Sequence, residues 1–335
     1  MEKTREEERG NRESWVGKDK VLVQTRGEGR TSDFWVVDLR DNKVMKLGGR
    51  VGLLWDHNIP HGLIAVDSVI YAIGRYKPDS ICCPKEEEEG IYHHDHTGTS
   101  FLDLADPSGR WKGIGGMLIS NRPFPCCASL SDKIFVFGAK ASKAHLNLGE
   151  FYDKKKNCWE AIPSPPLIRR DAFRHCRPVI CDPKHNRILV HFSYISSLYA
   201  YYPEDGHRWV CLNDHMPPWD GEPAPYLLDN VLYLISYKDN CITAFDICTK
   251  EHLEVSWSSC SPFGPHELAQ LTSPCMIYLG DNIMCVYPYA PSSFEYYRFQ
   301  VCRVSNQQQG VLITPLSTHL FPFQGPRTPI NTVAL

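Results

Sequence analysis

The side chains of this sequence that are best suited to binding a metal ion lie in residues 80–96, SICCPKEEEEGIYHHDH. The candidate ligands are Cys82, Cys83, His93, His94 and His96. Thiolate sulfur and imidazole nitrogen are the donors that zinc prefers. The spacing is poor, because adjacent cysteines fit one tetrahedral ion badly and no C-x₂-C pair occurs. Four consecutive glutamates are typical of a solvated loop. We expect an acidic surface loop here and no bound cofactor.

Short motifs of the large enzyme classes are missing. The sequence has no G-x-S-x-G nucleophile turn, no G-x-x-x-x-G-K-[ST] phosphate loop and no H-E-x-x-H zinc helix. Tyrosine, histidine and cysteine are plentiful, but no segment arranges them as a recognisable set of ligands. We therefore expect no catalytic residues and a protein that is not an enzyme.

Several tryptophans and arginines lie in long irregular segments outside the apolar runs. Tryptophan and arginine are enriched at the hot spots of protein interfaces. The candidates are Trp55, Arg169, Arg170, Trp219, Arg26 and Arg30. The competing interpretation is that the indoles fold back onto neighbouring elements and the guanidinium groups are solvated. We expect these six residues to bind a partner protein.

An internal repeat determines the elements that position these side chains. An apolar segment, a tight polar turn and a β-branched or aromatic run recur, as in VDSVIY (66–71) and LDNVLY (228–233). Asp, Asn, Ser and Gly between apolar runs predict β-hairpins. The six anchors of this series are Leu22, Tyr71, Phe135, Leu189, Tyr233 and Met284.

A second element follows each hairpin. It is an aromatic or aliphatic run that ends near an aspartate, followed by a polar turn and often a tryptophan, as in FYDKKKNCW (151–159). Its anchors are Asp38, Asp103, Asp153, Pro203, Asp246 and Tyr297. Both series repeat about every 50 residues, a period typical of propeller blades. One insertion at 76–98 explains the single long step in each series.

Four short strands per repeat predict one propeller blade. We expect an all-β, six-bladed propeller whose blades each contain four antiparallel strands, named a to d. Because strand direction alternates, the a–b and c–d turns share one face, and the b–c and d–a loops share the other. The long b–c and d–a loops hold the six candidates, so this loop face is the expected binding surface. Trp111, Trp159 and Trp209 occupy repeat positions, where we expect them to pack between blades.

The Tyr-Asp or Phe-Asp pair followed by tryptophan resembles the kelch repeat. Residues 13–320 are similar to the kelch and galactose-oxidase-like propeller superfamily, and most similar to divergent plant kelch proteins that often carry an F-box. The Gly-Gly that this family has after strand b is degraded, for example to Gly74-Arg75 and Gly138-Ala139. No F-box is visible before the propeller. The resemblance implies a kelch-type β-propeller.

Composition fits one large globular domain. The 335 residues are 42% hydrophobic, and a net charge of −3 gives no reason to expect nucleic acid or a membrane as partner. The charged N-terminus lacks the apolar stretch of a secretory signal. Fourteen scattered cysteines are typical of buried thiols in a cytoplasmic or nuclear protein. We expect a charged tail over 1–12, the propeller over 13–320 and a C-terminal tail over 321–335.

The sequence leaves more than one candidate for the strands that join the last blade to the first. Trp15-Val16 is one candidate for strand a of the first blade. Residues 311–314 are a candidate either for strand d of the sixth blade or for the strand that closes the first.

These observations favour a monomeric, non-catalytic interaction propeller, a substrate-recognition or scaffold module similar to kelch ubiquitin-ligase adaptors. One alternative is a propeller that binds a small molecule or metal and has enzymatic activity at the central channel. A second alternative is a decoy-like relative of F-box/kelch proteins that no longer recruits a ligase.

Overall fold

The structure is a computed structural model of the chain. It describes residues 19–26, 32–46, 62–75, 98–106, 111–118, 125–138, 148–166, 176–192, 195–216, 225–236, 241–259, 272–290, 293–305, 309–322 and 329–334. Within these ranges the chain forms strands, tight turns and one short 3₁₀ turn, η3 (Pro183–His185). No helix in these ranges is long and apolar enough to cross a membrane.

The strands are β1 (Lys20–Arg26), β2 (Ser32–Asp38), β3 (Lys43–Lys46), β4 (Gly62–Val66), β5 (Val69–Arg75), β6 (Gly98–Asp103), β7 (Lys112–Ile114), β8 (Cys126–Leu130), β9 (Lys133–Phe137), β10 (Gly149–Asp153), β11 (Cys158–Ile162), β12 (Cys176–Asp182), β13 (Arg187–Phe192), β14 (Ser197–Tyr202), β15 (Arg208–Asn213), β16 (Tyr226–Leu228), β17 (Val231–Ser236), β18 (Cys241–Asp246), β19 (Glu251–Trp257), β20 (Thr272–Gly280), β21 (Ile283–Ala290), β22 (Ser293–Ser305), β23 (Gln309–Pro322) and β24 (Pro329–Ala334).

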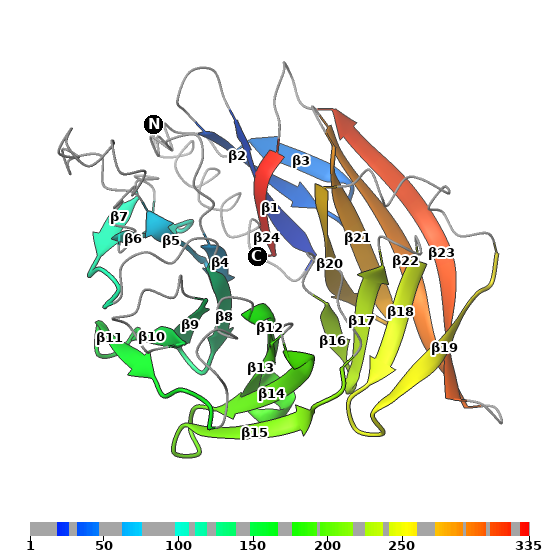
Figure 1. The fold of residues 1–335 in the computed structure, drawn as a ribbon. Coiled ribbons are helices and arrows are strands. Elements are labelled where there is room, and N and C mark those ends of the chain that lie inside the picture. The colour runs from blue at the N-terminus through cyan, green and yellow to red at the C-terminus, as the bar shows by residue number, and fades with distance from the viewer. Residues whose placement is uncertain are drawn as a thin grey trace, which may run out of the picture.

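Consecutive strands pair into antiparallel sheets. Three sheets contain the strands β4–β7, β8–β11 and β12–β15, each in chain order. The groups β16–β19 and β20–β23 follow the same plan. In Figure 1 the sheets surround a common centre, with β4, β8, β12, β16 and β20 on the inside. The fold is therefore all-β and β-propeller-like, which confirms the predicted fold class at this level.

The predicted hairpins are present at the a–b turns. Val66 pairs with Val69 and Leu228 with Val231, so two residues connect the strands in each case. Asp229 and Asn230 both have positive φ, at 46° and 66°. Asp and Asn tolerate this left-handed conformation better than other non-glycine residues, which explains their use in two-residue hairpin turns.

The repeated aspartate caps the following turn. Asp153 ends β10, and its Oδ1 accepts backbone N–H groups of Lys155 at 2.9 Å and Lys156 at 3.0 Å. Asp246 accepts N–H groups of Cys248 and Thr249 in the same way. This side-chain-to-backbone bonding fixes the c–d turn, since the aspartate replaces a backbone acceptor.

Every hydrophobic cluster found among the described residues lies between two neighbouring sheets. One joins the β4–β7 and β8–β11 sheets and contains Trp159. Another, which contains Trp111, lies between the sheet formed by β1, β2 and β3 and the β4–β7 sheet. Trp209 packs between β8–β11 and β12–β15. The expected inter-blade positions of these three tryptophans are confirmed. A further cluster joins β1 and β2 to β20–β22, so the β20–β23 group packs against the sheet of β1, β2 and β3.

The C-terminal strand closes the ring. The segment expected as a tail over 321–335 instead contains β24, which pairs antiparallel with β1 from Val21–Ala334 to Thr25–Pro329. A free backbone edge on β1 would otherwise remain beside the centre, which explains why the end of the chain returns there. Residues 311–314 lie in β23, the fourth strand of the β20–β23 group. Trp15-Val16 and residues 76–97 of the insertion lie outside the described residues.

One pairing departs from the repeat. The end of β19 leaves β18 and pairs in parallel with β23, from Glu254–Gly310 to Trp257–Ile313. The groups β16–β19 and β20–β23 thereby join into a single eight-stranded sheet at their outer edges.

Candidate functional site

The residues predicted from the sequence to bind a partner lie almost entirely outside the part of the chain that the structure describes. Trp55, Arg169, Arg170, Trp219 and Arg30 lie outside the described residues, and of Arg26 only the backbone, at the end of β1, is described. The five zinc candidates between Cys82 and His96 also lie outside. Among the residues that are described, no group of three His, Cys, Asp or Glu side chains is arranged to hold a metal ion.

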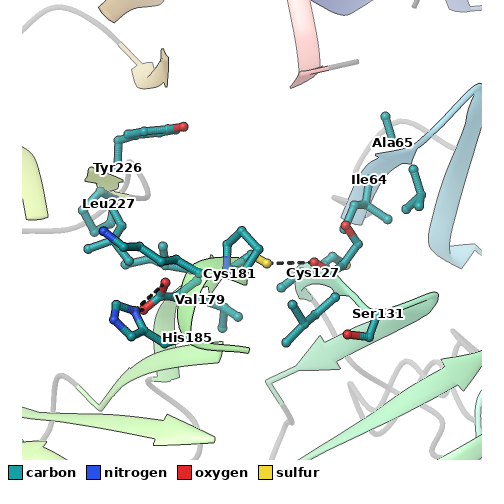
Figure 2. Close-up of a pocket in the computed structure, with 18 of the residues that line it drawn as sticks. Ile64, Ala65, Cys127, Ser131, Val179, Cys181, His185, Tyr226 and Leu227 are labelled. Atoms are coloured by element: carbon teal, nitrogen blue, oxygen red, sulfur yellow. Dashed lines mark hydrogen bonds and ion pairs between the residues drawn. The ribbon is translucent and has the colours of Figure 1, made fainter. Parts of the chain in front are cut away.

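A cavity of about 980 Å³ lies instead between the inner strands. It is lined by β4, β8, β12 and β16 and by the a–b turns that follow them, and Met276 of β20 also contributes. Figure 2 shows Tyr226 and Leu227 facing Ile64 and Ala65 across it, with Cys181 and Cys127 between them. The described residues of this lining were not predicted from the sequence as site residues.

The wall of the cavity is mainly apolar. Its aliphatic and aromatic lining includes Leu63, Ile64, Ala65, Val66, Ala128, Leu130, Val179, Ile180, Tyr226, Leu227, Leu228 and Met276. Each inner strand pairs with a neighbour in its sheet on one side only. Its other edge therefore presents backbone N–H and C=O groups toward the centre, where they can orient a ligand.

In the cavity wall, a thiol forms a hydrogen bond between two neighbouring sheets. Cys181 of β12 donates an Sγ–H hydrogen bond of 2.8 Å to the backbone oxygen of Ser129 in β8. Burial, with a smaller contribution from the charge of Asp182, raises the pKa of Cys181 to about 11. Tyr226 is also held neutral, because burial raises the pKa of its hydroxyl to about 12. Neither group is a nucleophile at neutral pH.

A histidine–carboxylate pair stands at the end of the cavity formed by the a–b turns. His185 Nδ1 lies 2.9 Å from Asp182 Oδ2, and both residues line the cavity. The Asp182 side chain is 4% exposed, whereas that of His185 is 38% exposed. The carboxylate can therefore fix the imidazole, while the imidazole remains accessible.

Arg187 supports this pair from within the sheet. Its Nε donates a 2.7 Å hydrogen bond to Asp182, and its Nη1 donates a weaker one of 3.4 Å to the Tyr202 hydroxyl. Burial lowers the pKa of Arg187, but these bonds and the charge of Asp182 raise it by more, so the guanidinium stays charged. The buried Asp182 charge is thus compensated.

The remaining charges at this end are also paired. Lys154 Nζ lies 3.7 Å from Asp67 and 3.4 Å from Asp132, and Lys184 Nζ lies 3.5 Å from Asp229. Hydrogen bonds from Lys155 and Lys154 lower the pKa of Asp132. The described residues of the rim therefore carry no surplus of positive charge that would attract an anionic ligand.

These candidate residues belong to the repeat itself, which is why sequence analysis missed them. Asp182 precedes the looser fourth turn of the hairpin series, His185 lies within that turn, and Cys181 belongs to an apolar run. The only available signal was that Pro183-Lys184-His185 lengthens this turn relative to the other copies.

Comparison with known proteins relates the chain to solved structures alone. No protein-family model and no curated protein sequence matches it. The structure is similar to that of a "putative 6-phosphogluconolactonase" from Bacteroides fragilis, with a TM-score of 0.52 and 10% identity over 91% of this chain and 82% of the other. A fungal alcohol oxidase of the AA5 family in complex with copper gives a TM-score of 0.43 and 12% identity over 93% and 92%.

The Bacteroides protein, whose fold this chain shares, is named as a "putative" enzyme. The expectation that the chain is not an enzyme is therefore wrong as a conclusion, because the absence of short motifs does not separate this architecture from that of a protein named as an enzyme. At 10% identity the likeness to the first protein establishes a shared fold, and the function of the chain has to be argued from its own residues.

Proposed function

We propose that the chain is a six-bladed, kelch-type β-propeller that binds a small organic molecule in the cavity between its inner strands and acts on it as an enzyme. The cavity itself carries this proposal. Ligand sites commonly measure about 300–1,000 Å³ and combine apolar walls with a few polar groups. The cavity described above has a matching volume, apolar strand walls and one histidine–carboxylate pair.

Three observations support the six-bladed ring. The sequence repeats six times, the clusters of the described core join successive sheets, and the last of these clusters joins the sixth group of strands to the first. The kelch assignment is supported by the capping aspartates and by the tryptophans between sheets.

The reaction class is proton transfer with water as the second reactant. His185 is the accessible base, and Asp182 orients it through Nδ1. In hydrolysis of an ester or lactone, His185 takes a proton from water while the water oxygen bonds to the carbonyl carbon. The ester C–O bond then breaks, and the proton passes to the departing alkoxide. The products are a carboxylic acid and an alcohol, joined in one molecule when the substrate is a lactone.

The name of the Bacteroides protein suggests a phosphorylated lactone, but the rim of this cavity does not. The described lining contains four aspartates, Asp67, Asp132, Asp182 and Asp229, with Lys184 as its one lysine. A phosphate would meet repulsion there. We therefore assign an uncharged lactone or ester as the substrate class.

The test is hydrolysis of glucono-δ-lactone, an uncharged lactone, followed by acid release in a pH-stat. We expect the wild type to exceed the rate in buffer. Ala65→Trp fills the cavity and should abolish this excess, whereas Ala161→Trp, on the exposed side of β11, should not. His185→Gln should lower kcat at least about a hundredfold, within the usual contribution of a general base.

A second Asp–His pair provides the matched control. His215 Nδ1 lies 2.8 Å from Asp214 Oδ1 on the surface, and it does not line the cavity. His215→Gln should leave the rate unchanged. A wild-type rate equal to that in buffer, or equal losses in the two histidine variants, would contradict the proposed function.

A further inference from the structure

The outer strand of the last group, β23, has an edge that no described strand covers along its C-terminal half. β22 pairs with β23 along its whole length, from Ser293–Pro322 to Ser305–Gln309. β19 covers the other edge only up to Ile313. Both long strands are visible at the outer side of the molecule in Figure 1. Residues 314–322 thus present a free backbone edge among the described residues.

This edge also exposes apolar side chains. Leu316 is 45% and Leu320 is 59% exposed, and they are two of the three large hydrophobic residues exposed in the described part of the chain. Thr318 is exposed between them. The alternate residues face the side of β1 and β2: His319 stacks on Tyr296 of β22 with ring centroids 5.0 Å apart, and the Tyr296 hydroxyl donates a hydrogen bond to the backbone oxygen of Leu39, which follows β2. One face of the free segment is therefore partly buried, and the face with the leucines is open.

Natural edge strands are usually protected by charged residues, especially lysine, by proline or by bulges. β23, QGVLITPLSTHLFP, contains no Asp, Glu, Lys or Arg, and its prolines, Pro315 and Pro322, lie at the two ends of the open segment, with a bulge next to Pro315. The residues between these two prolines therefore have neither charge nor proline to protect them against pairing. This part of the edge also carries no charge that would repel a second copy of itself.

We propose that β23 pairs antiparallel with β23 of a second copy of this chain, about a two-fold axis at Thr318. In this register Thr318 lies opposite its own counterpart, and Leu316 of each copy lies opposite Leu320 of the other. A two-fold interface must be self-complementary, and this arrangement makes two identical leucine pairs without opposing like charges. The edge is used once per molecule, so pairing ends at a dimer. This proposal replaces the expectation of a monomer and is independent of the cavity.

Sedimentation equilibrium tests the proposal. The wild type should show twice the 38.2 kDa mass of one chain, with the dimer fraction rising with concentration. Leu316→Lys and Leu320→Lys should each raise the dimer dissociation constant at least about tenfold, because every change occurs twice across the axis. Leu118→Lys is the matched control, since Leu118 is 58% exposed away from this strand, and it should leave dimerisation unchanged.

A cross-link tests the register in folded protein. Thr318→Cys should form a covalent dimer with a short bis-maleimide faster than the wild type, whose exposed Cys211 and Cys248 give the background rate. Leu118→Cys should stay at that background. A monomeric wild type at all concentrations, a dimer that persists in both lysine variants, or equal cross-linking at positions 118 and 318 would overturn the proposal.

Discussion

The indole Nε1 of Trp159 donates a 2.7 Å hydrogen bond to the backbone oxygen of Gly115, which follows the last strand of the neighbouring sheet. The ring is 7% exposed and packs with Tyr71, Ile73 and Val136. One side chain therefore joins two sheets both by packing and by a directed bond. Adjacent sheets have no backbone ladder between them here, so contacts of this kind hold successive blades together.

Replacing this indole should be costly. We expect Trp159→Ala to lower the free energy of unfolding by about 3–5 kcal/mol, because it leaves a large cavity between sheets. Lys155→Ala, at an exposed turn position four residues away, should change it by less than about 0.5 kcal/mol. Urea denaturation followed by circular dichroism measures both. Equal effects would contradict the assignment of Trp159 to an inter-sheet position.

Acid should weaken the c–d turns. Backbone hydrogen bonds, above all from Lys156, lower the pKa of Asp153, and the pKa of Asp246 is also lowered, because hydrogen bonds from Cys248, Thr249 and Arg303 outweigh its burial. A carboxyl whose folded pKa lies below its unfolded value of about 3.9 stabilises the fold above that pH. This stabilisation is lost as the pH falls through the folded pKa.

Asp153→Asn isolates the charge in this turn, because asparagine keeps an oxygen acceptor of the same size. The variant should be less stable than wild type at pH 6, and the difference should shrink as the pH is lowered below about 4. Asp153→Ala also loses the acceptor for two N–H groups and should cost about 1–3 kcal/mol at pH 6. A difference between wild type and Asp153→Asn that is constant from pH 6 to pH 3 would show that the charge is irrelevant.

The cavity thiol should resist alkylation. Because burial raises the pKa of Cys181 to about 11, only about one in a thousand of these thiols is ionised at pH 8. Cys211 and Cys248 are exposed. We expect iodoacetamide to label both at least about tenfold faster than Cys181, as read by peptide mass spectrometry. Labelling of Cys181 at a rate equal to theirs would mean that the thiol is accessible and ionised in solution.

Closure by β24 predicts a large effect of a short deletion. Removing residues 329–335 exposes the edge of β1 and should destabilise the protein by several kcal/mol, at about 1 kcal/mol for each lost backbone hydrogen bond. Removing Leu335 alone keeps β24 complete and should have little effect. Thermal unfolding of the two truncated chains measures the difference. Similar midpoints would show that β24 does not hold the ring closed.

The strands and turns of this protein could be predicted from sequence because their signals are local. An aspartate or asparagine between two apolar runs determines a hairpin within a few residues, as at Asp229-Asn230, and a capping aspartate such as Asp153 acts on N–H groups two and three residues away. Recurrence of these signals every 50 residues or so predicted the stacking of similar sheets, and the positions of Trp111, Trp159 and Trp209, because a repeat must bury its faces against its neighbours.

Only the tertiary structure decided the position of the cavity and the pairing of β24 and of β19, because these features depend on residues far apart in the chain. Cys181 and Ser129 are 52 residues apart, yet they meet at the cavity, whose described wall is shared among five repeats. The pairing of β24 with β1 joins the two ends of the described chain, and β19 crosses to β23. No local pattern specifies such contacts, because they arise only when the sheets close around one axis. The sequence by itself determined the strands and turns of each repeat, and the packing of the sheets around a common centre determined where the cavity lies.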